Sequence, residues 1–163
     1  MKRQKVVEGA LFKIPLSNVE FIYGRVAGGE TIVVYDSKTS IEIPHQEILE
    51  TKILFRIFVS NYVFTKQTLE RWEIIAIYPL EKELKGVVEF FVQDMFNYSN
   101  IKIYEGDNQF RSATFDECKN LEHFSIWGHD NVVARINDFY LGYNEGIASR
   151  AKIKNPLSQS LDF

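Results

Sequence analysis

Hydrophobic positions in the first third of the chain alternate with a period of two, the spacing of side chains on one face of a β-strand. The alternation is clearest in segment 20–27, where Phe21, Tyr23 and Arg25 share one side. Pro15 cannot donate to a β-ladder, so it marks the end or the edge of a strand. Three strands are predicted here, at residues 10–16, 20–27 and 31–36.

Glycines set the turns of this predicted three-stranded meander. Gly28-Gly29 predicts a two-residue hairpin turn with positive φ. Gly24 in mid-strand predicts a bulge or a close approach of another part of the backbone. These glycines do not form the G-x-G-x-x-G pattern, and no strand-to-helix turn follows them, so a phosphate-binding loop is not expected.

The middle of the chain continues as short strands joined by polar turns. Glu105-Gly106-Asp107-Asn108 is a strong turn signal between two of them. The predicted strands are residues 52–60, 72–78, 87–92, 101–104 and 110–113. Aromatic and β-branched residues are frequent throughout, as is typical of sheets.

Residues 44–49, 65–71 and 80–84 could each form a short helix or turn, and the stronger helical signals lie near the C-terminus. Thr114 and Glu117 form a capping box, which predicts a short helix. Segment 130–141 carries Val132, Ile136 and Phe139 on one stripe and ends before a glycine, the residue that favours the position after a helix.

The order of these elements predicts an α+β fold. We expect a mainly antiparallel, strongly bent or SH3-like barrel sheet followed by two C-terminal helices. Residues 1–142 are predicted to form a single β-rich domain. Residues 143–163 lack periodicity and are predicted to be an extended tail.

Charge and composition narrow the possible partners. The net charge is −3 over 163 residues, which argues against nucleic acid, because affinity for phosphates comes from clustered Lys and Arg. A single cysteine, Cys118, excludes a disulfide within the chain. The charged segment 1–10 is unlike a secretory signal, and no run of about 18 apolar residues predicts a membrane span. We therefore expect a cytoplasmic protein.

No set of residues predicts catalysis. His45, His123 and His129 lack the spacing of a metal-binding motif. Cys118 lies beside Glu117, whose charge disfavours a reactive thiolate. We expect no catalytic residues, no metal and no cofactor.

A series of short motifs does carry information. In chain order they are Glu8-Gly9, Phe12-Lys13-Ile14-Pro15-Leu16, Tyr23-Gly24-Arg25-Val26, Tyr35-Asp36, Ile53-Leu54-Phe55, Arg71-Trp72-Glu73-Ile74-Ile75, Pro79-Leu80, Phe90-Phe91-Val92-Gln93-Asp94, Ile103-Tyr104, Asp116-Glu117-Cys118, Trp127 and Val133-Ala134-Arg135-Ile136. In this order and spacing, across about residues 8–142, the chain resembles the immunity protein 26 family of bacterial polymorphic toxin systems.

The resemblance implies a non-enzymatic inhibitor that binds a cognate toxin, which could be a nuclease. It implies that the shared motif residues mainly specify the fold: Gly9, Phe12, Pro15, Gly24, Trp72, Pro79, Trp127 and Arg135. The candidates for partner binding are Glu20, Tyr23, Arg25, Asp36, Gln93, Asp94 and Asp107. The polar motif residues could instead belong to a buried network. Two other functions stay open, a small metal-dependent hydrolase of the phosphoesterase kind and a nucleic-acid-binding SH3-like module.

Overall fold

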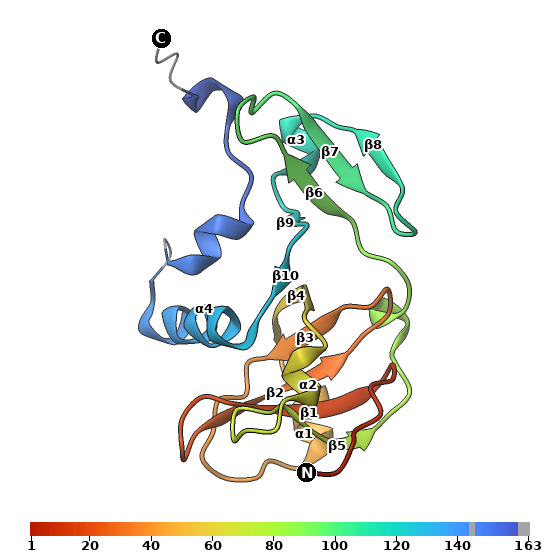
Figure 1. Cartoon of the computed structure of the whole chain (residues 1–163), viewed down its shortest axis with the longest axis vertical. Coiled ribbons are helices and arrows are strands. Elements are labelled where there is room, and N and C mark those ends of the chain that lie inside the picture. The colour runs from red at the N-terminus through yellow and green to blue at the C-terminus, as the bar shows by residue number, and fades with distance from the viewer. Residues whose placement is uncertain (144–145, 160–163) are drawn as a thin grey trace. The chain divides into compact units, whose positions relative to one another are not determined.

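The computed structural model describes residues 1–143 and 146–159. The chain is α+β and divides into two compact units (Figure 1). Unit 1 comprises Met1–Gly86 and Ile126–Val133, and unit 2 comprises Val87–Ser125 and Ala134–Phe163. The sequence, in contrast, predicts a single domain over residues 1–142 followed by a tail. The division arises because two separate sheets each gather their own hydrophobic core.

Unit 1 is built on a six-stranded sheet of order β10-β4-β3-β2-β1-β5. Its strands are β1 (Ala10–Pro15), β2 (Phe21–Val26), β3 (Ile32–Tyr35), β4 (Ile53–Val59), β5 (Glu73–Ile77) and β10 (Ile126–Trp127). All neighbours pair antiparallel except β10 and β4, which are parallel. The sheet is bent but not closed, because β10 and β5 end it without pairing with each other. Of the two expected forms, a strongly bent sheet or an SH3-like barrel, the closed barrel is therefore ruled out for this sheet.

The predicted meander of β1, β2 and β3 is confirmed, with a shifted turn. The positive φ angles fall on Gly29 and Glu30, at 62° and 63°, rather than on Gly28 and Gly29. Gly24 makes the predicted close approach: a Cβ there would lie 2.5 Å from the Phe12 ring and 2.9 Å from the carbonyl oxygen of Val33. The irregularities of register occur elsewhere, in the pairing of β1 with β5 and of β3 with β4.

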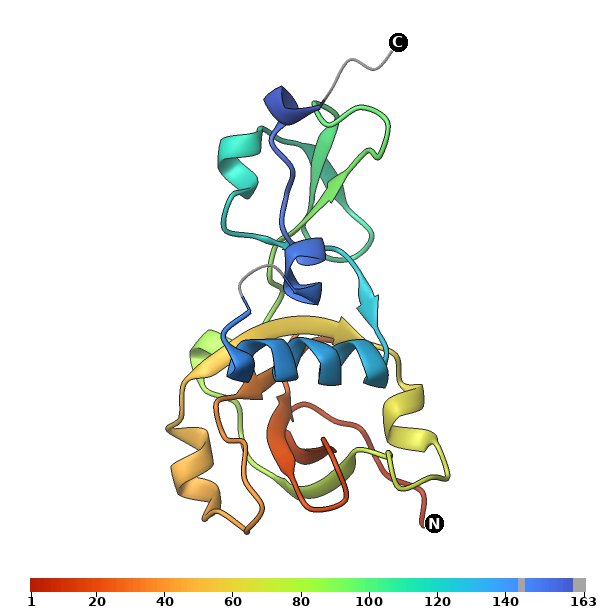
Figure 2. The same cartoon turned by 90° about the vertical axis from the view of Figure 1, so that its left-hand side faces the viewer.

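Short helices complete unit 1. They are α1 (His45–Leu49), α2 (Tyr62–Thr65) and the 3₁₀ turn η1 (Lys82–Leu84). Figure 2 shows α1 and α2 at the two ends of β4. Phe12 stacks on Trp72 with ring centroids 5.3 Å apart, and Phe64 packs edge-on against both rings. A second cluster, including Leu11, Val33 and Ile48, is fully buried.

Unit 2 is built on a four-stranded sheet of order β8-β7-β6-β9. Its elements are β6 (Phe90–Gln93), β7 (Ile101–Tyr104), β8 (Phe110–Ser112), α3 (Phe115–Cys118), β9 (Glu122–His123), η2 (Ile147–Ala151) and η3 (Pro156–Ser158). The predicted capping box is present, since the Thr114 hydroxyl accepts from the Glu117 amide and the Glu117 carboxylate accepts from the Thr114 amide. Phe91, Ile101, Ile103 and Cys118 form the core.

Helix α4 (His129–Leu141) confirms the long helix predicted for residues 130–141. Val132 and Ile136 are fully buried, as their stripe predicts, and Gly142 follows with a φ of 75°. Phe139 departs from the prediction, because it is 46% exposed. The described residues contain four α-helices: α3 and α4 lie in the C-terminal part, where two helices were expected, and α1 and α2 precede them. No helix in the described part of the chain has the length and apolar character to cross a membrane.

Candidate functional site

Two of the predicted partner-binding residues, Tyr23 and Arg25, are fully buried in unit 1. The Arg25 guanidinium donates to Glu81 Oε2 over 2.7 Å and to the carbonyl oxygens of Tyr78 and Pro79 over 3.0 and 2.6 Å. Arg25 therefore ties β2 to the chain that follows β5. The sequence leaves two roles open for Arg25, partner binding and a buried network, and its contacts match the buried network.

Tyr23 also holds the fold together. Its hydroxyl donates to Glu42 Oε2 over 3.2 Å and accepts from the amide of Ile43 over 3.1 Å. Burial, followed by the charge of Glu42, raises the pKa of Tyr23, while the Ile43 hydrogen bond opposes this. The hydroxyl stays protonated near neutral pH and fixes the loop before α1.

The other candidates in unit 1 are the acids Glu20, which is half-buried, and Asp36, which is exposed. Glu20 follows the β1–β2 turn, and its carboxylate lies 3.6 Å from the Lys38 ammonium. Asp36 is exposed directly after β3, where its amide donates to the carbonyl oxygen of Lys52 over 2.8 Å. Both carboxylates are within reach of a partner at the surface.

In unit 2, Gln93 and Asp94 organise the β6–β7 loop. Gln93 Nε2 donates to the carbonyl oxygens of Tyr98 and Lys154 over 2.8 and 2.7 Å, and its Oε1 accepts from the amide of Lys154 over 2.9 Å. Asp94 Oδ1 accepts from the amides of Phe96 and Asn97, which lowers the pKa of its carboxyl. The two Gln93 bonds to Lys154 dock this part of the predicted tail on the β6–β7 loop.

Asp107 lies exposed in the β7–β8 turn with a φ of 47°. The predicted turn signal is correct, since Gly106 and Asn108 also have positive φ. The carboxylate faces solvent in a conformation that Asp and Asn tolerate better than most residues.

The residues expected to specify the fold lie in structural positions. Phe12, Gly24, Trp72 and Trp127 are buried. A Cβ at Gly9 would lie 2.0 Å from the carbonyl oxygen of Tyr78. Pro15 ends β1, and the carbonyl of Pro79 accepts from Arg25. Arg135, which is 8% exposed, forms a two-point ion pair with Glu122.

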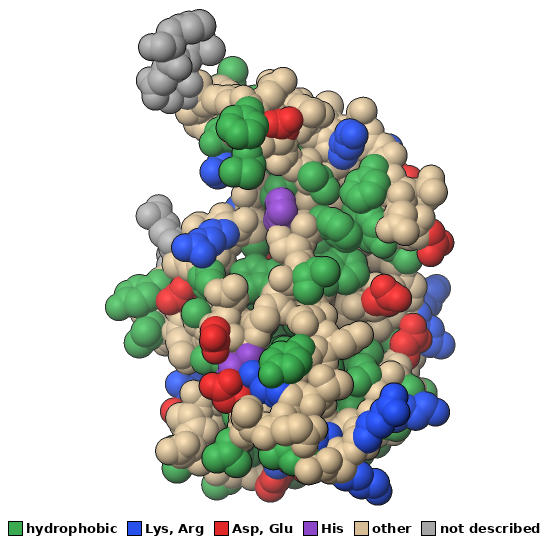
Figure 3. All heavy atoms as spheres, viewed as in Figure 1, with side chains coloured by type: hydrophobic (Ala, Val, Ile, Leu, Met, Phe, Trp, Pro, Cys, Tyr) green, Lys and Arg blue, Asp and Glu red, His purple; other side chains and the backbone are tan. Residues whose placement is uncertain are grey.

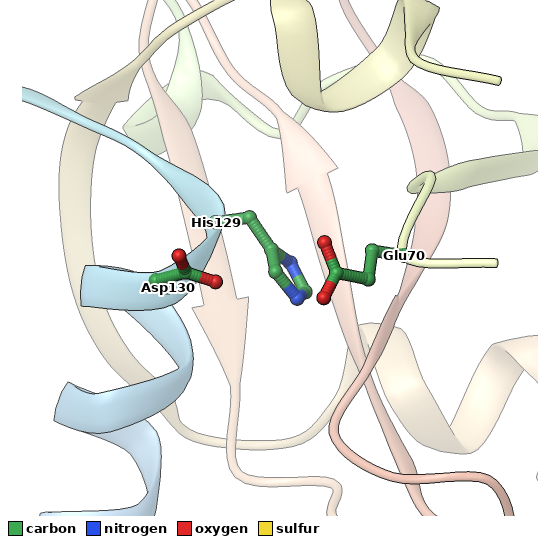
Figure 4. A group of neighbouring side chains, drawn as sticks. All are labelled: Glu70, His129 and Asp130. Atoms are coloured by element: carbon green, nitrogen blue, oxygen red, sulfur yellow. The ribbon is translucent and has the colours of Figure 1, made fainter. Parts of the chain in front are cut away.

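A cluster that the sequence did not reveal lies at the start of α4. Ligand atoms of Glu70, His129 and Asp130 all fall within 4.8 Å of one another. Figure 4 shows the Glu70 carboxylate facing the His129 ring, with Asp130 on the helix beside it. A groove of about 510 Å³ borders this cluster and is lined also by Lys13, Glu20 and Glu73. Glu70 is 59 positions before His129, so no local spacing could have identified the cluster.

The hydrogen bonding of His129 limits what this cluster can do. The indole N–H of Trp72 donates to His129 Nδ1 over 3.0 Å, so in the neutral ring the proton resides on Nε2. A metal at Nε2 would require the proton to move to Nδ1 and would break the Trp72 bond. Burial and then the charge of Lys66 lower the pKa of His129, and the Lys66 ammonium also binds Glu70 over 3.0 Å. The geometry therefore favours a structural histidine over a metal ligand or a general base.

The other two histidines and the cysteine have separate surroundings. His45 Nδ1 lies 2.6 Å from the Tyr78 hydroxyl, and His123 Nδ1 contacts the hydroxyl of Ser125. The candidate metal cluster found in the described residues contains only one histidine. Burial, reinforced by Glu117, raises the pKa of the Cys118 thiol. This direction agrees with the effect expected from the neighbouring Glu117 carboxylate.

Apolar side chains are the other feature that stands out on the surface. Met95, Phe96 and Leu157 of unit 2 are 81%, 90% and 93% exposed. Gln159 connects their two segments, because it donates to the carbonyl of Phe96 and accepts from the amide of Tyr98. Figure 3 shows hydrophobic side chains gathered over the β6–β7 loop.

Comparison with known proteins agrees with the motifs. A search of curated proteins and a search of solved structures each found no match. A scan against family models matched residues 7–101 to immunity protein 26. The matched region contains β1 to β6 and reaches the start of β7. Since this match spans more than half of the chain, the protein belongs to the immunity protein 26 family.

Proposed function

We propose that this protein binds a cognate bacterial toxin of a polymorphic toxin system and neutralises it without catalysis. The observation that carries this proposal is the family match over residues 7–101. We propose a cytoplasmic location, which the charged segment 1–10 supports, because it is unlike a secretory signal. A preformed surface of about 800 Å² on each partner is enough for specific, stable binding.

The exposed carboxylates support a basic toxin, such as a nuclease. Asp36 and Asp107 are exposed, and Glu20 is half-buried with its carboxylate in solvent contact. Like charges on one partner accelerate encounter with an oppositely charged partner and impose a salt dependence. Asp94 takes part less directly, because its carboxylate already accepts two amide hydrogen bonds.

The metal-dependent hydrolase is the less favoured reading. Its best residues are Glu70, His129 and Asp130, but the Trp72 hydrogen bond places a proton on the nitrogen that would bind the metal. The three histidines also bind three different partners within the fold. The nucleic-acid module is opposed by the net charge of −3.

Co-expression with the toxin encoded beside this gene tests the proposal. We expect growth to be restored and the two proteins to coelute in gel filtration. The same toxin with its catalytic residue replaced serves as a binding control that does not depend on cell survival. Continued killing together with the absence of a complex would refute the proposal.

A further inference from the structure

We propose that the outer edge of β5 binds an extended, acidic segment of the toxin, which adds to the sheet as a further strand. This inference rests on the proposed function and assigns it a surface. The edge, its hydrogen-bonding groups, the adjoining groove and the local charge all lie within unit 1.

Strand β5 ends the six-stranded sheet. In the described chain its strand partner is β1, and no strand lies on its other side. An edge strand presents backbone N–H and C=O groups that another chain can pair with, which is the basis of strand addition in peptide recognition. β5 therefore has the backbone requirement for such binding.

The Gln4 side chain forms hydrogen bonds with this edge like those that a neighbouring strand forms. Its amide Nε2 donates to the carbonyl oxygen of Trp72 over 2.8 Å, and its Oε1 accepts from the amide of Ile74 over 2.7 Å. One side-chain amide thus imitates a single peptide group of a neighbouring strand, and a bound strand would replace Gln4 at Trp72 and Ile74. Because the N–H and C=O of one residue face the same edge of a strand, the carbonyl of Ile74 faces this edge too.

A groove of about 610 Å³ lies between this edge and the N-terminal segment, which Figure 1 shows passing beside β5. Its apolar lining includes Leu69, Ile74 and Ile77. Leu69 is 89% exposed and Ile77 is 58% exposed. A strand lying in this groove would cover these apolar side chains with the alternate residues that face them.

The charge of the groove specifies the partner. Four of its five ionisable side chains are cationic, namely Lys2, Arg3, Lys5 and Arg71, and Glu73 is the exception. Figure 3 shows Lys and Arg side chains gathered over the N-terminal segment, at the lower right. This local excess contrasts with the net charge of −3 for the whole chain. An acidic segment therefore complements the groove.

A protein segment fits these features better than a nucleic acid does. Single-stranded nucleic acid is held by aromatic side chains on which bases stack. The described lining of this groove contains no aromatic residue. Backbone groups at a sheet edge are satisfied by a peptide backbone in regular register, which a nucleic acid lacks.

The test reverses the charge of the groove without altering the fold. One triple variant, the groove variant, carries Lys2→Glu, Arg3→Glu and Lys5→Glu. A second triple variant, the matched control, carries Lys82→Glu, Lys85→Glu and Lys102→Glu. All six side chains are exposed and both triple variants change the net charge equally. The partner is the catalytically inactive form of the toxin encoded beside this gene. We expect the groove variant to raise the Kd at least about tenfold more than the control does.

Hydrogen exchange supplies a readout independent of toxin activity. Toxin binding is expected to slow exchange of the Glu73–Ile77 amides in the wild-type chain. If the wild type, the groove variant and the control variant bind the toxin with equal affinity, and exchange in β5 is unchanged, this inference is overturned and the proposed function stands. Absence of binding by the wild-type chain would overturn both. A 12-nucleotide oligothymidine serves as a nucleic-acid probe. The inference would also be overturned if only the groove variant lost binding to this probe while its affinity for the toxin stayed unchanged.

Discussion

The indole N–H of Trp72 donates to Nδ1 of His129 over 3.0 Å, joining a core residue of unit 1 to the first residue of α4. The indole is fully buried, so its N–H depends on this acceptor. A buried donor left without a partner costs about 1–3 kcal/mol.

This bond predicts a loss of stability on acidification. Burial and then the charge of Lys66 lower the pKa of His129. Below the ordinary histidine pKa of about 6.5, the unfolded chain therefore binds more protons at this residue than the folded protein does. The free energy of unfolding should therefore be greatest above about pH 6.5 and fall as the pH drops towards the lowered pKa. Urea unfolding between pH 5 and pH 8 measures this.

Burial also lowers the pKa of His123. Two variants of His129 separate its contribution to the pH dependence from that of His123. His129→Asn keeps an acceptor oxygen for the indole and removes the titration, so its pH dependence should be shallower than that of the wild type. His129→Ala should lose about 1–3 kcal/mol at pH 8. An unchanged pH profile in His129→Asn would contradict the assignment.

Arg25 and Glu81 should contribute unequally to stability. Arg25→Met leaves the carbonyl oxygens of Tyr78 and Pro79 without a donor, which should cost about 2–4 kcal/mol. Glu81→Gln should cost less than Arg25→Met does, because the Gln amide oxygen still accepts from Arg25 and the Glu81 side chain is 48% exposed. Denaturant midpoints measured side by side test this order, and equal losses would argue against it.

Gly24 should not tolerate a methyl group. The added carbon would meet the Phe12 ring at 2.5 Å in a core that is also held by Trp72. We expect Gly24→Ala to cost about 1–3 kcal/mol through overpacking. Gly128 is the matched control, since a Cβ there has no neighbour within 4 Å. Thermal unfolding should show Gly128→Ser within about 0.5 kcal/mol of the wild type.

Gln93 should determine whether the segment around Lys154 stays docked. Gln93→Glu keeps an acceptor for the Lys154 amide but cannot donate to the carbonyls of Tyr98 and Lys154. We expect faster hydrogen exchange at the Lys154 and Tyr98 amides and little change in the global unfolding midpoint. Asn97→Ala, in the same loop, serves as a control that keeps all three Gln93 bonds.

Carboxylates at the surface should affect how fast the toxin binds. Combining Glu20→Gln, Asp36→Asn and Asp107→Asn removes three negative charges while keeping side-chain size. With a basic toxin, the association rate at low salt should fall several-fold, and its salt dependence should weaken. The dissociation rate should change less. Stopped-flow association at two salt concentrations tests this, and an unchanged association rate would argue against steering by these charges.

Much of the local structure follows from short-range patterns. Alternation placed the strands of the meander, the Thr114–Glu117 capping box placed α3, and the stripe of Val132 and Ile136 placed α4. Each depends on residues within a few positions of one another. The turn after Gly28 was misplaced by one residue, because Gly29 and Glu30 both adopt positive φ and a non-glycine residue there gives no sequence signal.

The candidate site could be predicted only in part. Of the acids expected at the surface, Asp107 is exposed, whereas Glu20 and Asp94 are half-buried. Asp36, for which a buried network and a binding role were both open, is exposed. Tyr23 and Arg25 were grouped with them, but the strand alternation that placed both on one face could not show that this face is buried by Leu80 and Ile48.

The α+β class, strands β1 to β8, helices α3 and α4, and the family follow from the sequence, because these depend on local periodicity and on motifs in linear order. The tertiary structure alone decided that the sheet stays open, that the chain forms two units, and which polar residues are buried. It also brings Trp72 to His129, which is 57 positions away, and Gln4 to Ile74 of β5, which is 70 positions away. Such pairs depend on how elements pack, and neither member carries a local signal for its partner.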